Sequence, residues 1–355
     1  MEASDRMLLV PRQLTVLTTS QCTARCAHCS MNSGPERRDR LDLPTILRTI
    51  DELHATDELK VVIFAGGEPT LLRDDLLEAI AHAADYGILT RIVTNAYWAA
   101  TPARARKRLI ALREAGLAEL NISADDYHLP YVPFDRVANA WRASKGLGFN
   151  AVIIANCHGS RSVITPSYIC RALGEDLPLR FDERGRSLPL PNPAGDGTIY
   201  GLSNAYIQRL GRGHEYVSAE DLNFPGSQDA LLKPCPWAVR SAAISAKGDL
   251  VACCGMEAEG NPVLDFGALS GRSLTDLLHH ANDSLLVNAI ALLGPMFLKR
   301  FIDEKHVDVG FKSQYSTVCE VCEDIVTNRQ AVDVALANAG ELAAYVLAAQ
   351  DRLKA

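Results

Sequence analysis

The 355 residues include 36 basic and 43 acidic side chains, for a net charge of −7, and 48% of them are hydrophobic. This composition predicts a folded globular protein of two domains and excludes extended disorder. There is no long run of basic residues, no apolar stretch long enough to cross a bilayer and no signal-peptide core near the start, so we expect a cytoplasmic protein that contacts neither nucleic acid nor membrane.

Continuous apolar runs, several of them rich in β-branched residues, recur along the first half of the chain. Continuous rather than alternating apolarity predicts strands that are buried on both faces, as in a parallel sheet. We expect these strands at residues 14–19, 61–64, 88–93, 120–123, 151–155 and, from a weaker pattern, 177–181.

Helical patterns alternate with these runs. Asp42 is placed to cap the first helix, Pro44 falls in its first turn, and apolar residues from Leu43 to Leu53 share one face. Further helices are expected at 74–86, 102–115, 134–147 and 166–173. Strand–helix units repeated in this way predict an α/β fold, either a βα-repeat barrel or a doubly wound sheet.

The pattern changes after residue 182. Residues 183–232 are dense in glycine and proline, which predicts a connector with short structured pieces. Beyond it we expect a hairpin over 242–253 that turns at Gly248, then several helices, the last over 328–353. The chain is therefore expected to divide into an α/β domain at 1–182, the connector at 183–232 and an α+β domain at 233–355.

Ten cysteines occur, at positions 22, 26, 29, 157, 170, 235, 253, 254, 319 and 322. In a chain without a signal sequence, clustered cysteines more often bind metal than form disulfides. Cys22, Cys26 and Cys29 follow the first expected strand on one short loop, at the strand end where α/β sites lie. Three cysteines suit a cubane iron–sulfur cluster with one iron left open for a small molecule. Zinc bound together with His28, or three simply buried thiols, are the alternatives.

This C-x3-C-x2-C loop resembles the signature of the radical S-adenosylmethionine (radical SAM) superfamily, in which the open iron binds the amino and carboxylate groups of SAM. The resemblance covers about residues 14–182. It implies a partial (β/α)6 barrel and a SAM-binding [4Fe–4S] cluster held by Cys22, Cys26 and Cys29. Two features depart from the family: His28 stands where an aromatic residue is usual, and no glycine element is recognisable at 150–159.

Motifs at other strand ends extend the resemblance. Gly66-Gly67-Glu68-Pro69 looks like the family's GGEP element, whose backbone contacts the SAM amino group, and two glycines permit a close approach of a ligand. The same residues also fit a simple βα turn capped by the glutamate. Asn95, Ser123 and Asp125 resemble positions near the SAM carboxylate and ribose, although such residues commonly cap turns. The resemblance thus implies a SAM site made of His28, Gly66, Gly67, Glu68, Pro69, Asn95, Ser123 and Asp125.

Four of the later cysteines form a second set. Cys235 and Cys253 are brought together by the expected hairpin, and the segment Cys319-Glu-Val-Cys322 is a local chelating pair. Four thiolates are enough to close an iron–sulfur cluster, and two cysteine pairs also suit structural zinc. The set resembles the twitch domain, a shorter relative of the SPASM domain, and this implies one auxiliary [4Fe–4S] cluster at Cys235, Cys253, Cys319 and Cys322. Cys254 is an alternative ligand.

The resemblance implies a radical SAM enzyme that receives electrons from an external reductant such as flavodoxin or ferredoxin. We expect it to modify a ribosomal peptide or another natural product, with dehydrogenation of a small alcohol or sugar, or epimerisation, as the alternative. Only 13 residues precede the first expected strand, so no fused peptide-recognition domain is expected. A non-catalytic iron–sulfur or zinc scaffold is the alternative from a different class, and the glycine motif would be needless for it. The candidates for a catalytic role are Cys254, Cys157 and His128, and none of them is assigned. Cys157 and Cys170 also fit as core residues.

Overall fold

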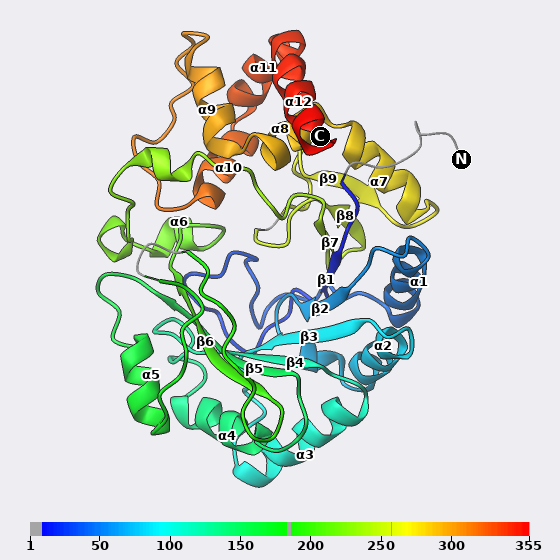
Figure 1. Cartoon of the computed structure of the whole chain (residues 1–355), viewed down its shortest axis with the longest axis vertical. Helices are drawn as coiled ribbons and strands as arrows, with labels where there is room; N and C mark the ends of the chain where they lie inside the picture. Colours follow the sequence, from blue (N-terminus) through cyan, green and yellow to red (C-terminus); the bar gives the residue numbers. More distant parts are fainter. Residues whose placement is uncertain (1–8, 183–185, 257, 355) are drawn as a thin grey trace.

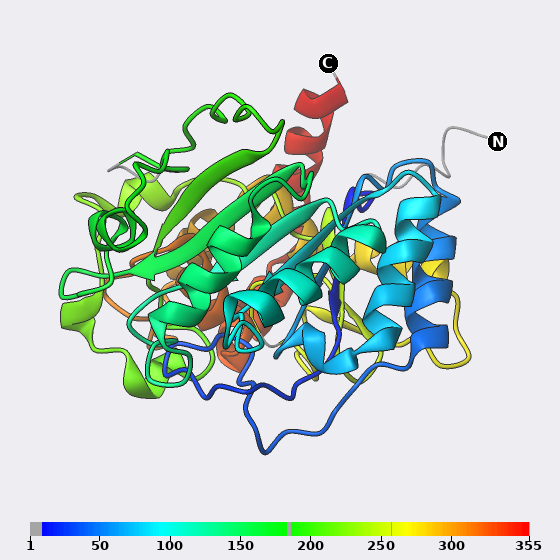
Figure 2. The same cartoon turned by 90° about the horizontal axis from the view of Figure 1, so that it is seen from below.

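A computed structural model describes residues 9–182, 186–256 and 258–354 of the chain. Six parallel strands, β1 to β6, lie side by side in sequence order, and the helices α1 to α5 cover their outer face (Figure 1, Figure 2). The partial barrel of alternating strands and helices is therefore confirmed. The strands are β1 (Gln13–Leu17), β2 (Val61–Ala65), β3 (Leu89–Thr94), β4 (Glu119–Ser123), β5 (Ala151–His158) and β6 (Ile199–Tyr206). The helices are α1 (Leu43–His54), α2 (Asp74–Asp85), α3 (Pro102–Glu114), α4 (Phe134–Ser144) and α5 (Pro166–Leu173), with a 3-10 turn, η2 (Pro69–Leu72), after β2.

The helix and strand patterns of the sequence explain these elements. Asp42 caps α1 by accepting a hydrogen bond from the Thr45 N–H at 2.8 Å, and the apolar face of α1 is buried. β1 and β2 are buried over nearly their whole length, whereas β3, β4 and β5 alternate between more and less buried positions. The less buried Val93, Ser123 and Cys157 line a cavity inside the barrel. These three strands are therefore open on their inner face, which continuous apolarity did not predict.

The sixth strand is not at 177–181, where the sequence pattern predicted it. Those residues contribute isolated bridges, such as that between Leu179 and Leu202, whereas β6 pairs with β5 along all eight of its residues. β6 thus lies within the segment expected to be a connector. Its sequence is interrupted by Gly201, Ser203 and Asn204, and an edge strand tolerates such residues because its outer side has only an isolated bridge and a few hydrogen bonds to residues 178–181.

The same sheet continues into the C-terminal part of the chain. β7 pairs in parallel with β1, and β8 pairs antiparallel with both β7 and β9, which confirms the hairpin at Gly248. The expected last helix is instead two helices, α11 and α12, with Asn338 between them. The remaining elements are α6 (Gly213–Tyr216), η3 (Ala219–Asp221), η4 (Gln228–Leu231), β7 (Ser241–Ile244), β8 (Asp249–Val251), β9 (Asp265–Ala268), α7 (Leu274–Asp283), α8 (Leu285–Leu292), α9 (Pro295–Asp303), α10 (Val318–Val326), α11 (Arg329–Ala337) and α12 (Ala339–Lys354).

Helices α8 to α12 gather at the end of the molecule opposite α3 and α4 (Figure 1). One nine-stranded sheet joins the two parts, and the boundary between the expected domains stays a prediction. Across the described residues, no single helix has the length and apolarity to span a bilayer; the sharply bent pairs α8–α9 and α11–α12 meet those two criteria only when each pair is taken together.

Candidate functional site

A cavity of about 230 Å³ lies at the carboxyl ends of the parallel strands. Residues from the first cysteine loop, from the ends of β2 to β5 and from the end of β6 line it together. Glu68, Pro69 and Asp125, which the sequence also placed in this site, are not part of the lining. The predicted site residues that do line the cavity are Cys22, Cys26, His28, Cys29, Gly66, Gly67, Asn95, Ser123, His128 and Cys157, and the sequence analysis missed Tyr206, Ile207 and Gln208.

The thiol of Cys22 is buried next to neutral hydrogen-bond donors. Its Sγ accepts the Ala24 N–H at 3.4 Å and the Asn95 side-chain amide at 3.6 Å. Burial raises the pKa of the Cys22 thiol to about 12, so the thiolate form requires a positive partner such as a metal.

Two sets of three side chains near this cavity each have their ligand atoms within 4.8 Å of one another, as one ion requires: Cys26 with His28 and His128, and Cys157 with His28 and Asp125. The three cysteines of the loop are not such a set among the described residues. The iron–sulfur cluster expected at these three cysteines stays a prediction.

Arg212, which follows the edge strand β6, binds the cysteine loop that follows β1. Its side chain is 9% exposed, and its guanidinium donates to the Cys26 carbonyl at 2.9 Å and to the Ser33 carbonyl at 2.7 Å. The Arg212 N–H donates to the Cys29 carbonyl at 3.1 Å. Gly211, at a φ of 51°, allows this approach, because a Cβ there would lie 2.5 Å from the Ser30 carbonyl oxygen. The sequence analysis missed Arg212 because a lone arginine in a glycine-rich segment forms no motif.

Gly66 and Gly67 pack the end of β2 against the chain that leads into the cysteine loop. The Gly67 N–H donates to the Thr19 carbonyl at 2.6 Å, and a Cβ on Gly67 would lie 2.0 Å from the carbonyl oxygen of Gln21. Gly66 adopts a φ of 114°, and its Cβ would lie 2.7 Å from the Thr19 oxygen. The close approach that these glycines permit is therefore to residues 19–21 of the chain itself, and their contact with SAM stays a prediction.

Glu68 is fully buried and ties β2 to β3. Its carboxylate accepts the Thr94 hydroxyl at 2.8 Å, the Asn95 N–H at 2.9 Å and the Thr70 hydroxyl at 2.6 Å. It also caps η2, as the simpler interpretation of this motif predicted. Burial raises the pKa of the Glu68 carboxyl, and four hydrogen bonds to the charged form oppose that shift. Through Asn95, Glu68 positions a residue that lines the cavity.

Asp125 orients two of the histidines. Its carboxylate is 1% exposed and lies 2.9 Å from His128 Nδ1 and 3.3 Å from His28 Nε2. Burial alone would raise the pKa of Asp125, but the two imidazoles hold it well below its usual range. Burial would likewise lower the pKa of His128, yet Asp125 holds it well above the usual value. The ring of His28 also stacks on Tyr127 at a centroid distance of 4.8 Å, so His28 is fixed from two sides.

The cysteines of the second set also converge. Cys253 and Cys322 each interact electrostatically with Cys235 and Cys319, and Cys254 lies beside them. Burial raises the pKa of the Cys319 thiol to about 12 and holds those of Cys253 and Cys322 well above the usual value. No three of these sulfurs, all in the described part of the chain, lie mutually within 4.8 Å, and the choice between an iron–sulfur cluster and zinc stays a prediction.

Cys253 and Cys254 have different neighbours. The Gly255 N–H donates to Cys253 Sγ at 3.3 Å, whereas Cys254 Sγ pairs with the Ser241 hydroxyl at 3.5 Å. Each of these sulfurs thus has one neutral hydrogen-bond partner, and the choice of Cys253 as the ligand stays a prediction.

Helix α10, which carries Cys319 and Cys322, connects the two cysteine sites. Glu320 is fully buried and accepts the Arg209 N–H at 2.7 Å and the Ser316 N–H at 2.9 Å. Glu323 accepts the Gly211 N–H at 3.2 Å and pairs with His214. Residues 209–214 therefore contact α10 on one side and, through Arg212, the first cysteine loop on the other.

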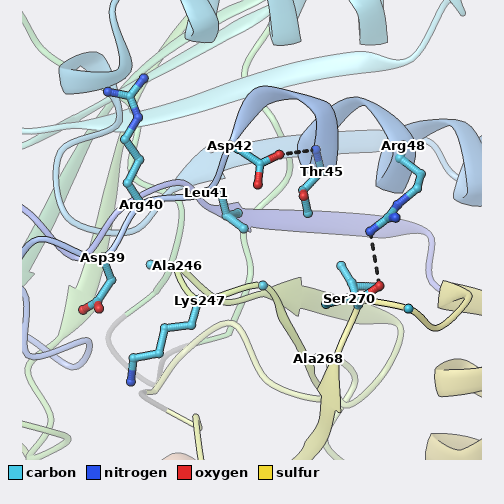
Figure 3. Close-up of a pocket in the computed structure, with 13 residues that line it drawn as sticks. Asp39, Arg40, Leu41, Asp42, Thr45, Arg48, Ala246, Lys247, Ala268 and Ser270 are labelled. Carbon is cyan, nitrogen blue, oxygen red and sulfur yellow. Dashed lines mark hydrogen bonds between the residues drawn. The ribbon is translucent and has the colours of Figure 1, made fainter.

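A second cavity, of about 520 Å³, lies between the start of α1 and the β7–β8 turn (Figure 3). It is lined by charged side chains including Asp39, Asp42 and Lys247, and Arg48 crosses it to donate to the Leu269 carbonyl at 3.2 Å. No cysteine lines it. This cavity joins α1 to the C-terminal strands and is separate from the cysteine sites.

Comparison with known proteins supports the resemblance seen in the motifs. Residues 16–155 match the family model of the Radical SAM superfamily. The chain is 24% identical over 134 residues to the putative peptide biosynthesis protein YydG of Bacillus subtilis strain 168; the alignment covers 38% of this chain and 42% of YydG, so the chain spans less than half of that relative's length.

Two further similarities extend over most of the chain. It is 28% identical over 303 residues to the PqqA peptide cyclase of Xanthomonas campestris pv. campestris strain B100, which covers 77% of this chain and 75% of the cyclase. The solved structure of native anSMEcpe with bound AdoMet and Cp18Cys peptide aligns with a TM-score of 0.49 and 12% identity, over 95% of this chain and 99% of that one.

Proposed function

Because the chain belongs to the radical SAM superfamily, we propose that it cleaves SAM reductively and abstracts a hydrogen atom from a ribosomal peptide or another natural product. The observation that carries this proposal is the cavity at the strand ends, where three cysteines of one loop meet two glycines and small polar side chains. A metal scaffold needs no cavity beside its thiols.

The donor set fits the cofactors that this reaction needs. Cys22, Cys26 and Cys29 would hold a [4Fe–4S] cluster with one open iron, and Cys235, Cys253, Cys319 and Cys322 would hold an auxiliary [4Fe–4S] cluster. When bound, the first cluster would supply the electron that breaks a carbon–sulfur bond of SAM, and SAM would supply the radical that takes a hydrogen atom from the substrate. The raised thiol pKa at both sites is consistent with metal-bound cysteines, because a cation there offsets the cost of burying thiolates.

The chain's own residues would hold the reactants in position. Asn95 and Ser123 would offer polar groups to SAM, and the backbone of Gly66 and Gly67 borders the same cavity. Cys157 also lines the cavity, and burial raises the pKa of its thiol to about 12, which keeps it protonated. A protonated thiol at this position is suited to donate a hydrogen atom, as an epimerisation would require.

A peptide substrate is favoured over a small alcohol or sugar by the names of the relatives. Both the PqqA peptide cyclase and the putative peptide biosynthesis protein are named for peptides.

Anaerobic reconstitution followed by assay of 5′-deoxyadenosine with dithionite tests the proposal. We expect the native protein to form this product, and the Cys22→Ala/Cys26→Ala/Cys29→Ala variant to form none. Cys170→Ala, on α5 and outside the cavity lining, is the matched control and should remain active. A native protein with a full complement of iron that leaves SAM intact would contradict the proposal. Addition of short precursor peptides and of a panel of sugars, with product masses measured, then tests the substrate class.

A further inference from the structure

A groove of about 550 Å³ on the outer side of the barrel is strongly basic. Four cations line it together with two aromatic rings and two alanines, and no acidic residue is part of the lining. Nearby cations outside the groove are paired, Arg91 with Glu119 and Lys145 with Glu175, whereas none of the four has an ion pair within the described chain. The groove residues are Tyr97, Trp98, Ala100, Arg104, Lys107, Arg108, Ala111 and Arg136.

This concentration of positive charge stands out against the rest of the molecule. The whole chain has a net charge of −7, yet α3 carries several arginines and a lysine and has Glu114 as its one acidic residue. Arg104 and Lys107 are exposed on α3, and Arg136 of α4 adds a third cation beside them. An unpaired basic surface of this kind attracts an acidic partner and speeds its association.

The groove is linked to the first cysteine site by a short chain of hydrogen bonds. The indole N–H of Trp98, in the groove, donates to the Thr94 hydroxyl at 3.1 Å. The next residue, Asn95, lines the cysteine cavity and donates from its side chain to Thr23 at 3.0 Å and to Cys22 Sγ at 3.6 Å. The turn at residues 94–98 therefore has one end at the basic surface and the other at a cysteine thiol.

We propose that this groove docks an acidic electron-carrier protein, with a flavin or an iron–sulfur centre, that delivers an electron to the centre held by Cys22, Cys26 and Cys29. The inference rests on the proposed function, because reductive cleavage of SAM consumes one electron that must come from outside the chain. In each transfer the carrier is oxidised by one electron and the acceptor centre is reduced by one, with no bond formed in that step. An acidic substrate peptide is the other occupant that the charge would suit, and the experiment separates the two.

The test is the double charge reversal Arg104→Glu/Lys107→Glu, assayed with two reductants. With reduced flavodoxin, an acidic carrier, at low salt, we expect SAM cleavage by the variant to be slower by about tenfold or more, because opposite surface charges set the encounter rate. The rate of the native protein should fall with added salt while that of the variant changes little. With dithionite, a small reductant that needs no docking surface, both proteins should cleave SAM equally.

The matched control is Arg142→Glu/Arg171→Glu, which reverses two exposed arginines outside the groove and should behave as the native protein does. Equal flavodoxin-driven rates in the groove variant and the native protein would overturn the proposal. So would a variant whose KM for peptide rises with the flavodoxin-driven rate unchanged, since the groove would then bind substrate. If native protein fails to cleave SAM with dithionite, the proposed function fails, and the affinity of flavodoxin for native protein and variant still decides the docking proposal.

Discussion

The conformation of the first cysteine loop depends on two residues far apart in the sequence. Gly67 brings the end of β2 against the chain entering the loop, and Arg212 binds carbonyl oxygens at Cys26 and Ser33. Neither residue needs to contact a cofactor to be essential for the site. The sequence motif identified Gly67 and predicted a contact with SAM, which stays a prediction, but a motif could not show that the backbone at Gln21 also approaches this glycine.

Substitution of Gly67 should damage the protein without any ligand present. A Cβ at Gly67 would lie 2.0 Å from a backbone oxygen that cannot rotate away, so Gly67→Ala must displace the chain at Gln21. We expect a loss of about 1–3 kcal/mol in the free energy of unfolding of the metal-free protein, measured by denaturant titration. Gly226→Ala is the control, since nothing lies within 4 Å of a Cβ there. Equal stability of Gly67→Ala and native protein would show that the chain at Gln21 can move aside without a cost in stability.

Removal of the Arg212 side chain should weaken the loop as well. Arg212→Ala removes the side-chain donor from the Ser33 carbonyl and leaves the Cys26 carbonyl with the Cys29 N–H alone, at a cost of about 1–3 kcal/mol. We expect a lower melting temperature and less iron retained at the first site after desalting of reconstituted protein. Arg171→Ala, an exposed arginine of α5, should retain its iron. If Arg212→Ala holds iron as tightly as the control does, the hydrogen bonds from the Arg212 side chain have no role in the site.

At the scale of elements, α10 is the contact between the two cysteine sites. Its glutamates alternate with its cysteines, so that Glu320 and Glu323 bind residues 209–214 while Cys319 and Cys322 join the second set. Residues three apart in a helix lie about one turn from each other. Glu320 is therefore next to Glu323 on the surface of α10, and Cys319 is next to Cys322. The sequence motif predicted the chelating cysteines, but it gave no indication that the intervening glutamate is fully buried.

Disturbing the Glu320 contact should therefore affect both sites. Glu320→Gln keeps the shape of the side chain but replaces one carboxylate acceptor by an NH2 group, which cannot accept from the Arg209 or Ser316 N–H. We expect a loss of about 1–3 kcal/mol in stability and a lower iron content at the first site as well as the second. Glu304→Gln, at the exposed C-cap of the neighbouring helix α9, is the control. Loss of iron at the second site alone would show that α10 does not support the cysteine loop.

The five strands with strong apolar runs and their helices could be predicted from the sequence, and β6 could not. β1 to β5 bury at least one face, which favours apolar side chains, whereas β6 is an edge strand with glycine and polar residues. The prediction of a single long C-terminal helix was also wrong. Its apolar periodicity continues across Asn338, where the chain bends by 80°, because both helices bury one face.

At the scale of the whole molecule, one sheet carries the barrel and continues into the C-terminal part. β1, which leads into Cys22, is paired on its other side with β7, whose hairpin leads to Cys253. Neighbours on one sheet are held at a fixed spacing, and α10 adds a second connection. The two cysteine sites are thus fixed relative to each other although their ligands come from separate parts of the chain, a relation that motif spacing alone could not predict.

Because the two thiol sets are separate, their iron contents should be separable by mutation. Native protein reconstituted anaerobically should hold about eight irons and eight sulfides, from two clusters. Cys22→Ala/Cys26→Ala/Cys29→Ala should leave about four, and Cys319→Ala/Cys322→Ala should also leave about four, measured by elemental analysis. The second variant should still cleave SAM with dithionite, since Glu320 and Glu323 rather than the thiols bind α10 to residues 209–214.

Cys170→Ala is the control for thiol loss and should retain all eight irons, because Cys170 belongs to neither set. Circular dichroism on Cys319→Ala/Cys322→Ala distinguishes loss of a cluster from loss of the fold, which a metal centre can itself stabilise. Zinc instead of iron at the second site, or a triple variant that keeps all its iron, would contradict the assignment. A folded double variant that turns over substrate at the native rate would show that the second cluster is not needed for turnover. The buried carboxylates of α10 would then be the part of the C-terminal region on which the first site depends.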